Sequence, residues 1–367
     1  MGNKSLRVLC QGRLVGRVAE TPERVLAFEY DAAWLRDGFS ISPFKLPLEK
    51  RVFIASRDPF GGNFGVFDDS LPDGWGRLLI DRLLTKKGIR PAEVSVLDRL
   101  AIVGRSGKGA LEYAPEDVLV TDASIPDLDT LAREAEAILN EKDDGCGLEE
   151  LVRLGGSSGG ARPKVLLNVD GEAWIIKFRA SIDPSTIGQQ EFDAMRTAEA
   201  AGLDVPEVRL FEGKYFGARR FDRTGHGGKV FMISASGLLN ASHRFPCLDY
   251  NALMAATLAL TRDYREVEKM FRLMCFNVFW HNRDDHAKNF SFLYDDGRWR
   301  LSPSYDLTYS DGMGGEHATS IDGEGRNPSE ANIMGVAKKC GMTLTRAEKI
   351  MDDVKVAVKH SKSRKHK

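Results

Sequence analysis

The sequence is poor in cysteine, has no long apolar run and carries almost no net charge. Its five cysteines are scattered and form no C-x-x-C pair, which argues against a disulfide framework or a thiolate zinc site and fits a reducing cytoplasm. No apolar stretch approaches the roughly 20 residues that a membrane helix needs, and the first residues lack the apolar core of a signal peptide. The formal net charge of -1 gives no general attraction to nucleic acid or to membranes. We therefore expect a cytoplasmic protein with no membrane partner.

The length and the residue patterns predict more than one domain. With 367 residues, the chain exceeds the size at which one hydrophobic core stops growing. Its 42% apolar and 29% charged residues are ordinary for a globular protein. Short β-rich runs occur near the N-terminus, helical patterns dominate from residue 250 onward, and the Gly- and Asp-rich segment 142–147 is a plausible boundary. We expect a β-rich and helical subdomain (1–142), a small lobe (143–222) and a helical lobe (223–367).

Polar side chains within residues 281–309 have the spacing of a phosphotransfer site. Asp284, His286 and Asn289 form the pattern D-x-H-x-x-N, and Asp306 follows a short predicted hairpin. A protein kinase places its catalytic Asp five residues before an Asn that binds magnesium, and a second Asp then joins the metal to the phosphates. Asp284, Asn289 and Asp306 fit these three positions in order. Taken alone, the pattern also occurs in ordinary polar turns, so its context decides.

A glycine-rich loop precedes this stretch in the chain. The segment Gly155–Gly160 has four glycines around Ser157 and Ser158. Such a loop has little side-chain bulk and many free N–H groups, so it can wrap closely around anionic oxygens. A flexible linker is the alternative. The loop leads directly into a predicted hairpin of two apolar strands, which favours the phosphate-binding interpretation.

Two lysines follow the glycine-rich loop. Lys177 lies within the second apolar strand, where a buried ammonium is costly without a partner. In a kinase, the partners of such a lysine are the α- and β-phosphates and a glutamate on a helix. Glu191, at the start of a predicted helix, is the candidate for that glutamate. Lys164, which ends the loop, is a second cation of the right type, with simple surface exposure as its alternative.

Three further segments carry structural predictions. Asp73 is predicted to cap a helix that ends at Gly88. The segment Gly104–Gly109 contains a Gly-Lys pair but lacks the spacing of a P-loop, and we interpret it as a turn rather than a phosphate contact. Residues 219–221 end a predicted hairpin at the place in the chain where the hinge of a kinase meets adenine. These residues would also suit any edge strand.

Taken together and in this order, several motifs resemble the HipA-like serine/threonine kinase family of bacterial toxin–antitoxin modules. These motifs are GGSSGGARPK, WIIKF, RRFDR, NRDDHAKNF and SPSYDLTY, together with VFDDSLPDGWGRLLI near the N-terminus and EHATSIDGEG near the C-terminus. The resemblance covers nearly the whole chain, and the motifs are specific as a set. It implies an α+β, two-lobed protein-kinase-like fold with an N-terminal β-rich subdomain and a helical C-terminal lobe.

The resemblance also implies roles for individual residues. Asp284 is expected to be the catalytic base, with His286 as the catalytic-loop histidine. Asn289 and Asp306 are expected to bind magnesium. The residues expected to bind ATP are Ser157, Ser158, Gly159, Gly160, Lys164, Lys177, Arg219, Arg220, Phe221, His286, Asn289, Tyr305 and Asp306.

One loop serine is expected to regulate the enzyme. Members of the family carry a serine in the phosphate loop whose autophosphorylation would expel the loop and disable ATP binding, and Ser157 falls at this place. The adjacent Ser158 is the alternative phosphorylation site. The position after the catalytic Asp is Asp285 here, and its role stays open.

The resemblance implies partners, and two other functions compete with the kinase hypothesis. The expected partners are a protein substrate, such as an aminoacyl-tRNA synthetase, and a helix-turn-helix antitoxin through which DNA would be contacted indirectly. The first rival is a co-repressor with a kinase fold but little turnover. The second is a metallo-hydrolase, because His281, Asp285 and His286 nearly match H-x-H-x-D-H. Arg283 replaces the middle histidine, however, and a guanidinium cannot bind zinc.

Overall fold

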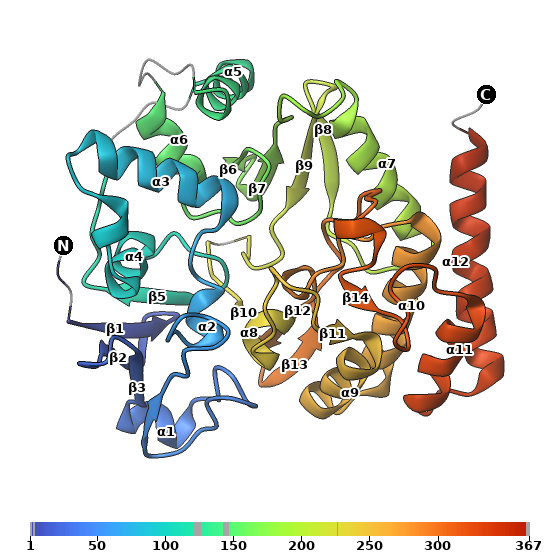
Figure 1. The fold of residues 1–367 in the computed structure, drawn as a ribbon, viewed down its shortest axis with the longest axis horizontal. Coiled ribbons are helices and arrows are strands. Elements are labelled where there is room, and N and C mark those ends of the chain that lie inside the picture. Colours follow the sequence, from blue (N-terminus) through green and yellow to red (C-terminus); the bar gives the residue numbers. More distant parts are fainter. Residues whose placement is uncertain (1, 3, 121–125, 142–146, 226, 365–367) are drawn as a thin grey trace. The chain divides into compact units, whose positions relative to one another are not determined.

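The computed structural model describes residues 2, 4–120, 126–141, 147–225 and 227–364 (Figure 1). The chain forms two compact units, which we describe separately. The first comprises Met1–Gly188 and Arg209–Met232, and the second comprises Gln189–Val208 and Ile233–Lys367. The predicted boundary at 142–147 falls almost wholly outside the described residues, and the three-part division remains a prediction.

The first unit contains two antiparallel sheets. The larger sheet has the strand order β4-β3-β2-β1-β5, and the smaller has the order β6-β7-β9-β8. The strands of the larger sheet are β1 (Ser5–Cys10), β2 (Arg13–Glu20), β3 (Leu26–Tyr30), β4 (Val52–Ile54) and β5 (Leu111–Ala114). Those of the smaller sheet are β6 (Lys164–Val169), β7 (Glu172–Lys177), β8 (Val208–Phe211) and β9 (Tyr215–Arg219). In β1, buried Leu6, Val8 and Cys10 alternate with outward-facing residues, which is the period of a half-buried strand and confirms the predicted N-terminal strands.

The helices of the first unit follow these strands in the chain. They are α1 (Ala32–Asp37), α2 (Gly65–Asp68), α3 (Gly74–Lys86), the 3-10 helix η1 (Pro91–Glu93), α4 (Val96–Val103), α5 (Leu128–Leu139) and α6 (Leu148–Gly155). The predicted helix after Asp73 is α3, and Asp73 does occupy its N-cap position. Helix α6 ends at Gly155, so the glycine-rich loop begins where this helix stops.

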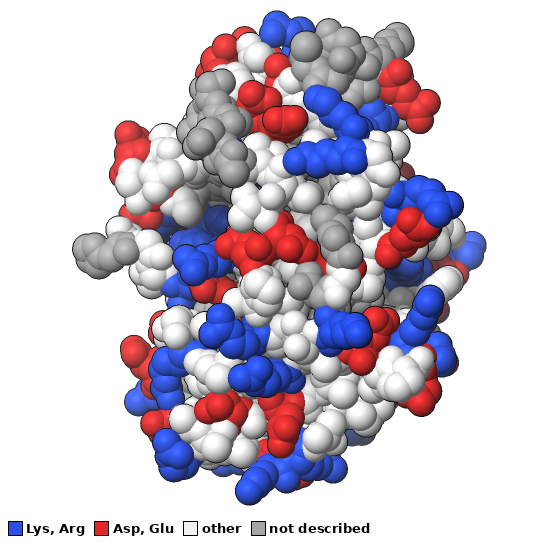
Figure 2. Space-filling view, turned by 90° about the vertical axis from the view of Figure 1, so that its left-hand side faces the viewer, with Lys and Arg blue, Asp and Glu red and all other residues white. Residues whose placement is uncertain are grey.

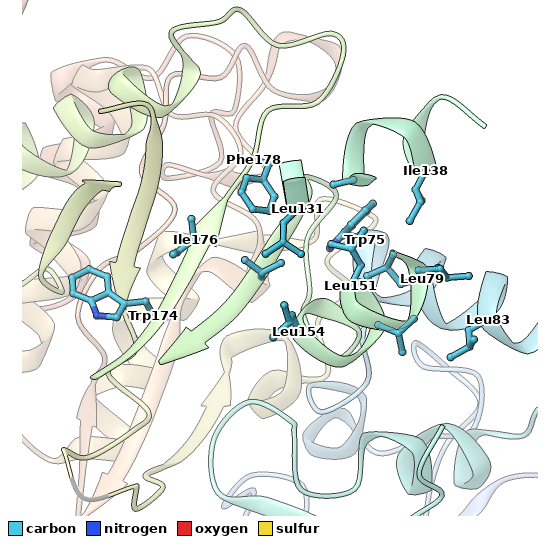
Figure 3. Packing of buried hydrophobic residues seen from close by; sticks show 14 residues of the cluster. Trp75, Leu79, Leu83, Leu131, Ile138, Leu151, Leu154, Trp174, Ile176 and Phe178 are labelled. Carbon is cyan, nitrogen blue, oxygen red and sulfur yellow. The ribbon is translucent and has the colours of Figure 1, made fainter. Parts of the chain in front are cut away.

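One hydrophobic cluster connects the glycine-rich loop to the lysine strand. Figure 3 shows its side chains converging from α3, α5, α6 and β7. The fully or nearly fully buried members include Trp75, Leu79, Leu131, Ile138, Leu151, Leu154, Trp174 and Ile176. Helix α6 leads into the loop and β7 ends at Lys177, so close packing of one core fixes both elements.

The second unit is mainly helical. Its elements are α7 (Ile187–Ala200), β10 (Phe231–Ser234), α8 (Ala235–Leu239), β11 (Leu248–Asp249), α9 (Tyr250–Thr261), α10 (Tyr264–Trp280), η2 (Ala287–Asn289), β12 (Ser291–Asp295), β13 (Arg298–Leu301), η3 (Met313–Gly315), β14 (Thr319–Ser320), α11 (Glu330–Lys339) and α12 (Leu344–Arg364). Helix α7 and strand β10 begin in the first unit and end in the second. Strands β10, β12 and β13 form a three-stranded sheet, and β11 pairs with β14. Among the helices that the structure describes, none combines the length and apolarity needed to cross a membrane.

Helix α10 directly precedes the predicted catalytic loop in the chain. Its buried residues include Val267, Met270, Phe271 and Met274, which recur at helical spacing and form the core face of this helix. The helix ends at Trp280, and His281 adopts the left-handed conformation (φ 66°) that commonly terminates helices. The predicted hairpin downstream is also present, as β12 pairs antiparallel with β13.

Candidate active site

In the first unit, the two loop serines are buried and their hydroxyls are hydrogen-bonded. Ser157 Oγ donates to the carbonyl oxygen of Ser106 at 2.9 Å, and Ser158 Oγ donates to that of Gly155 at 2.6 Å. Only 8% of Ser157 and 5% of Ser158 is exposed. The glycine-rich loop is therefore an ordered structure with defined contacts, which argues against the flexible-linker alternative.

Residues that immediately precede or begin α3 hold the tip of the loop. The Gly160 amide donates to the Asp73 carboxylate, and the Trp75 amide donates to the Gly160 carbonyl at 2.8 Å. A Cβ added at Gly76 would lie 2.3 Å from the Ser158 carbonyl oxygen, so this contact requires glycine. Asp73 thus occupies the predicted cap position, but its carboxylate makes no cap hydrogen bond to α3. Sequence reasoning missed this role because 87 residues separate Asp73 from Gly160 in the chain. The glycines on both sides of Trp75 were the local signal of a close backbone approach.

The two lysines of the hairpin lie directly opposite each other. In the pairing of β6 with β7, Lys164 is the partner of Lys177. Directly opposed residues point to the same face of a sheet, and like charges there destabilise the pair. Lys164 is buried and donates to the Gly159 carbonyl, whereas Lys177 Nζ lies 5.5 Å from the centre of the Phe216 ring. Two ammonium groups on one face beside a glycine-rich loop suit a polyanionic ligand.

The predicted hinge residues are held by neighbouring strands and by one buried carboxylate. The Arg220 amide donates to the Ala173 carbonyl at 2.7 Å, and its guanidinium contacts Asp222 at 2.7 and 2.9 Å. Arg219 lies 3.5 Å from Glu172 Oε1, and Phe221 is half-buried. The side chain of Arg220 is therefore engaged in structure, and adenine contact at residues 219–221 remains a prediction.

In the second unit, Asp284, His286 and Asn289 come together in one loop. The side chain of Asp284 is 61% exposed, and His286 Nε2 lies 3.9 Å from its Oδ1. Asn289 Nδ2 donates to the Asp284 carbonyl at 2.7 Å, which leaves the amide oxygen of Asn289 pointing elsewhere. The loop thus presents an accessible carboxylate and an oriented amide oxygen, which is the kind of ligand that magnesium accepts.

Tyr305 joins the segment that carries Asp306 to this loop. The Tyr305 hydroxyl donates to the Lys288 carbonyl at 2.6 Å and lies 2.6 Å from Ser291 Oγ. Lys288 directly precedes Asn289 and Tyr305 directly precedes Asp306, so this hydrogen bond joins the segments that carry the two predicted metal ligands. Asp306 has φ 57°, a left-handed conformation that costs most side chains energy but suits Asp. The Tyr305 hydroxyl is thus engaged within the protein, and the nucleotide contact that the resemblance implies for Tyr305 remains a prediction.

Asp284 and His286 also line a small pocket. Its volume is about 60 Å³, and its wall includes the exposed apolar side chains of Phe245 and Met313. The predicted base therefore lines a small recess in the second unit. Glu191, the predicted partner of Lys177, is buried in α7 with 3% exposure, and its pairing remains a prediction.

Asp285 has a structural role that the sequence left open. It is fully buried, and its carboxylate accepts hydrogen bonds from the Tyr250 hydroxyl at 3.0 Å and the Thr319 amide at 3.2 Å. His317 Nδ1 lies 2.9 Å from the same carboxylate. Asp285 therefore ties the predicted catalytic loop to residues 317–319, and its carboxylate is too buried to face solvent for a metal.

Replacing Asp285 by Ala is expected to lower the free energy of unfolding by at least about 2 kcal/mol, because three buried polar groups lose their acceptor. Urea denaturation measures this loss, and hydrogen exchange should accelerate at 317–319. Asp295→Ala, on the exposed β12–β13 hairpin, is the control. Equal stability of both variants would contradict the structural role of Asp285.

The metallo-hydrolase alternative is not supported by the arrangement of these side chains. His281 Nε2 lies 3.3 Å from Asp311, whereas Asp285 is engaged with His317. Burial, followed by the charge of Arg283, lowers the pKa of His281 despite the nearby Asp311. In the described part of the chain, no three His, Cys, Asp or Glu side chains gather as a metal site. A magnesium site of one Asp and one Asn falls outside that grouping, since Mg²⁺ commonly keeps several waters.

Comparison with known proteins identifies the fold class first. A solved structure from Shewanella oneidensis, a complex of HipA, HipB and operator DNA, contains a chain that matches 98% of this chain and 90% of its own length, with a TM-score of 0.74 and 19% identity. The predicted α+β, two-lobed kinase-like fold is thereby confirmed.

Sequence comparison then identifies the family. Residues 6–114 match the HipA N-terminal domain, and residues 156–361 match the HipA-like C-terminal domain. A Sinorhizobium fredii protein named "Putative kinase Y4mE" is 31% identical over 334 residues, covering 82% of this chain and 76% of the relative. The "Serine/threonine-protein kinase toxin HipA" of Shewanella oneidensis is 22% identical over 323 residues, covering 78% and 70%. The chain belongs to the HipA family, as its motifs predicted.

Proposed function

We propose that this protein is an ATP- and Mg²⁺-dependent serine/threonine protein kinase of the HipA toxin type. The geometry of the Asp284–Asn289 loop carries the proposal, because it combines an accessible carboxylate with an amide oriented by its own hydrogen bond. The names of two relatives, "Putative kinase Y4mE" and "Serine/threonine-protein kinase toxin HipA", support the proposal. The resemblance further suggests a substrate within the translation machinery, such as an aminoacyl-tRNA synthetase.

The residues present fit a magnesium nucleotide. The opposed pair of Lys164 and Lys177 suits the negative charge of a triphosphate, and the oxygens of Asn289 and Asp306 suit magnesium. Bound ATP would supply the phosphoryl group, and the metal would neutralise charge on its phosphates. Asp284 would orient the attacking hydroxyl and accept its proton through a carboxylate oxygen.

Ser157 is the site that we propose for autophosphorylation. The Ser157 hydroxyl donates to the Ser106 carbonyl, which lies in a different segment of the chain. The Ser158 hydroxyl instead donates to the carbonyl of Gly155, the last residue of the preceding helix α6. A phosphate on Ser157 could not keep the hydrogen-bond donor of its present contact and would add charge in a buried position. Modification of Ser157 would therefore displace the loop and inactivate the enzyme.

Incubation with ATP and Mg²⁺ tests this function. The wild-type protein should gain the mass of one phosphate, mapped to the peptide that contains Ser157. Lys177→Ala should bind ATP about 10- to 100-fold more weakly by calorimetry, because a charge-assisted contact worth about 1.5–3 kcal/mol is lost. Lys45→Ala, which removes an exposed lysine of the same unit, is the control. Unchanged ATP binding in Lys177→Ala together with no phosphate uptake by the wild type would refute the proposal.

A second candidate function is that of a co-repressor with little turnover. The solved HipA structure that matches this fold is a complex with HipB and operator DNA, so we propose that this chain also binds a helix-turn-helix antitoxin. Figure 2 shows Lys and Arg side chains interspersed with Asp and Glu on one face, and the net charge is -1, which suits indirect rather than direct DNA contact. A wild-type protein that binds ATP but takes up no phosphate would favour this candidate.

A further inference from the structure

The turn at Gly104–Gly109 is fixed beside the glycine-rich loop. On one side, the Gly109 amide donates to the buried carboxylate of Asp222 at 2.8 Å. On the other side, the Ser106 carbonyl accepts the hydroxyl of Ser157 at 2.9 Å. The segment is a turn, as its sequence predicted, but hydrogen bonds on both sides of Lys108 hold it against the loop.

Lys108 extends from this turn to the exposed tip of the loop. A Cβ added at Gly159 would lie 2.9 Å from Lys108 Nζ and 3.0 Å from an Asp73 carboxylate oxygen, and one added at Gly160 would lie 2.5 Å from Lys164 Nζ. Two ammonium groups therefore approach two consecutive glycines. Lys108 is half-buried and has no hydrogen bond or ion pair with any residue that the structure describes.

We infer that Lys108 is a phosphate-contacting residue of the glycine-rich loop. The inference rests on the proposed kinase function, because the phosphate would come from bound nucleotide or from phosphorylated Ser157. The Lys108 ammonium makes no hydrogen bond in the described part of the chain, although the Asp73 carboxylate lies near the same loop tip, so an anion held at this tip could contact Lys108 directly. Lys108 comes from the N-terminal region of the chain, so it would add a cation that the glycine-rich motif itself does not contain.

Nucleotide titration tests whether Lys108 contacts the phosphates of bound nucleotide rather than phosphorylated Ser157. Unphosphorylated Lys108→Ala should bind ATP about tenfold more weakly than wild type and AMP almost equally well, because AMP lacks the β- and γ-phosphates. Lys108→Arg should recover most of the ATP affinity, and Lys45→Ala should match wild type. Thermal unfolding of Lys108→Ala should be unchanged, since no described partner is lost. Tripolyphosphate is titrated in parallel as a probe without the nucleoside.

The phosphorylated protein provides the second arm. If the contact is to phosphorylated Ser157, Lys108→Ala should leave ATP affinity unchanged but raise hydrogen exchange at residues 156–161 in the phosphorylated form only. The inference would be overturned if Lys108→Ala and wild type bound ATP with equal affinity, bound tripolyphosphate with equal affinity and showed equal hydrogen exchange. That result would leave the kinase proposal intact. A wild-type protein that binds tripolyphosphate but not ATP would overturn the kinase proposal alone. Binding of neither ligand would overturn both.

Discussion

Asp284→Asn is expected to reduce phosphoryl transfer by about 10²- to 10⁴-fold, the usual contribution of a general base. The substitution keeps the size of the side chain and removes the carboxylate that would accept the hydroxyl proton. Because the Asp284 side chain is 61% exposed and Asn has nearly the same shape as Asp, folding should be unaffected. Initial rates with labelled ATP measure the first effect, and calorimetric ATP titration should give a dissociation constant close to that of wild type.

Asp296→Asn is the matched control for this experiment. Asp296 is exposed at the turn between β12 and β13, and its left-handed conformation (φ 47°) also suits Asn. Its transfer rate should equal that of wild type. A wild-type rate in Asp284→Asn would exclude Asp284 as the base, whereas a parallel loss of ATP binding would assign it a role in holding the nucleotide.

Asp222→Ala is expected to destabilise the first unit by about 3–5 kcal/mol, because it leaves buried arginines without a counter-charge. Arg220 and Arg223 both contact the Asp222 carboxylate, at 2.7 and 2.8 Å, and Asp222 is itself 5% exposed. Urea denaturation gives the change in the free energy of unfolding. Asp37→Ala removes an exposed partner of Arg13 in the same unit and should change stability little.

The stabilisation by Asp222 should also depend on pH. Burial alone would raise the pKa of Asp222, but Arg220, Arg223 and the Gly109 amide outweigh burial and lower the pKa from 3.8 to about 2. A depressed pKa stabilises the folded state above the unfolded value, and the effect is lost as pH falls from about 4 towards 2. The stability difference between wild type and Asp222→Ala should therefore shrink over this range. A difference that stays constant would contradict the ion-pair explanation.

The parts of the site that are local in sequence could be predicted from it. The D-x-H-x-x-N loop spans six residues, so its spacing alone places Asp284 near Asn289, and the structure adds the hydrogen bond between them. The strands beside the glycine-rich loop were similarly visible from their apolar runs. The pairing register of β6 with β7, which the composition does not reveal, places Lys164 directly opposite Lys177.

The parts that depend on distant residues could not be predicted. Asp285 looks like its neighbour Asp284, and only the return of residues 317–319 distinguishes a buried carboxylate from an exposed one. The pattern at Asp73 correctly predicts the start of a helix, but the Gly160 amide, 87 residues away in the chain, donates to the carboxylate that would otherwise cap the helix. The turn that carries Lys108 is likewise held by distant residues, because Asp222 accepts from the Gly109 amide and Ser157 donates to the Ser106 carbonyl.

The hydrogen bonds made by Asp73, Trp75 and Ser106 bear on whether the two matched domains of this protein can be separated. These three residues lie within the match to the HipA N-terminal domain, whereas the loop they hold begins the match to the C-terminal domain. The boundary between the two domain matches therefore runs through one hydrogen-bonded structure. A fragment that began at residue 156 would contain the motifs that resemble a kinase. It would lack Asp73, Trp75 and Ser106, whose hydrogen bonds fix the conformation of the glycine-rich loop.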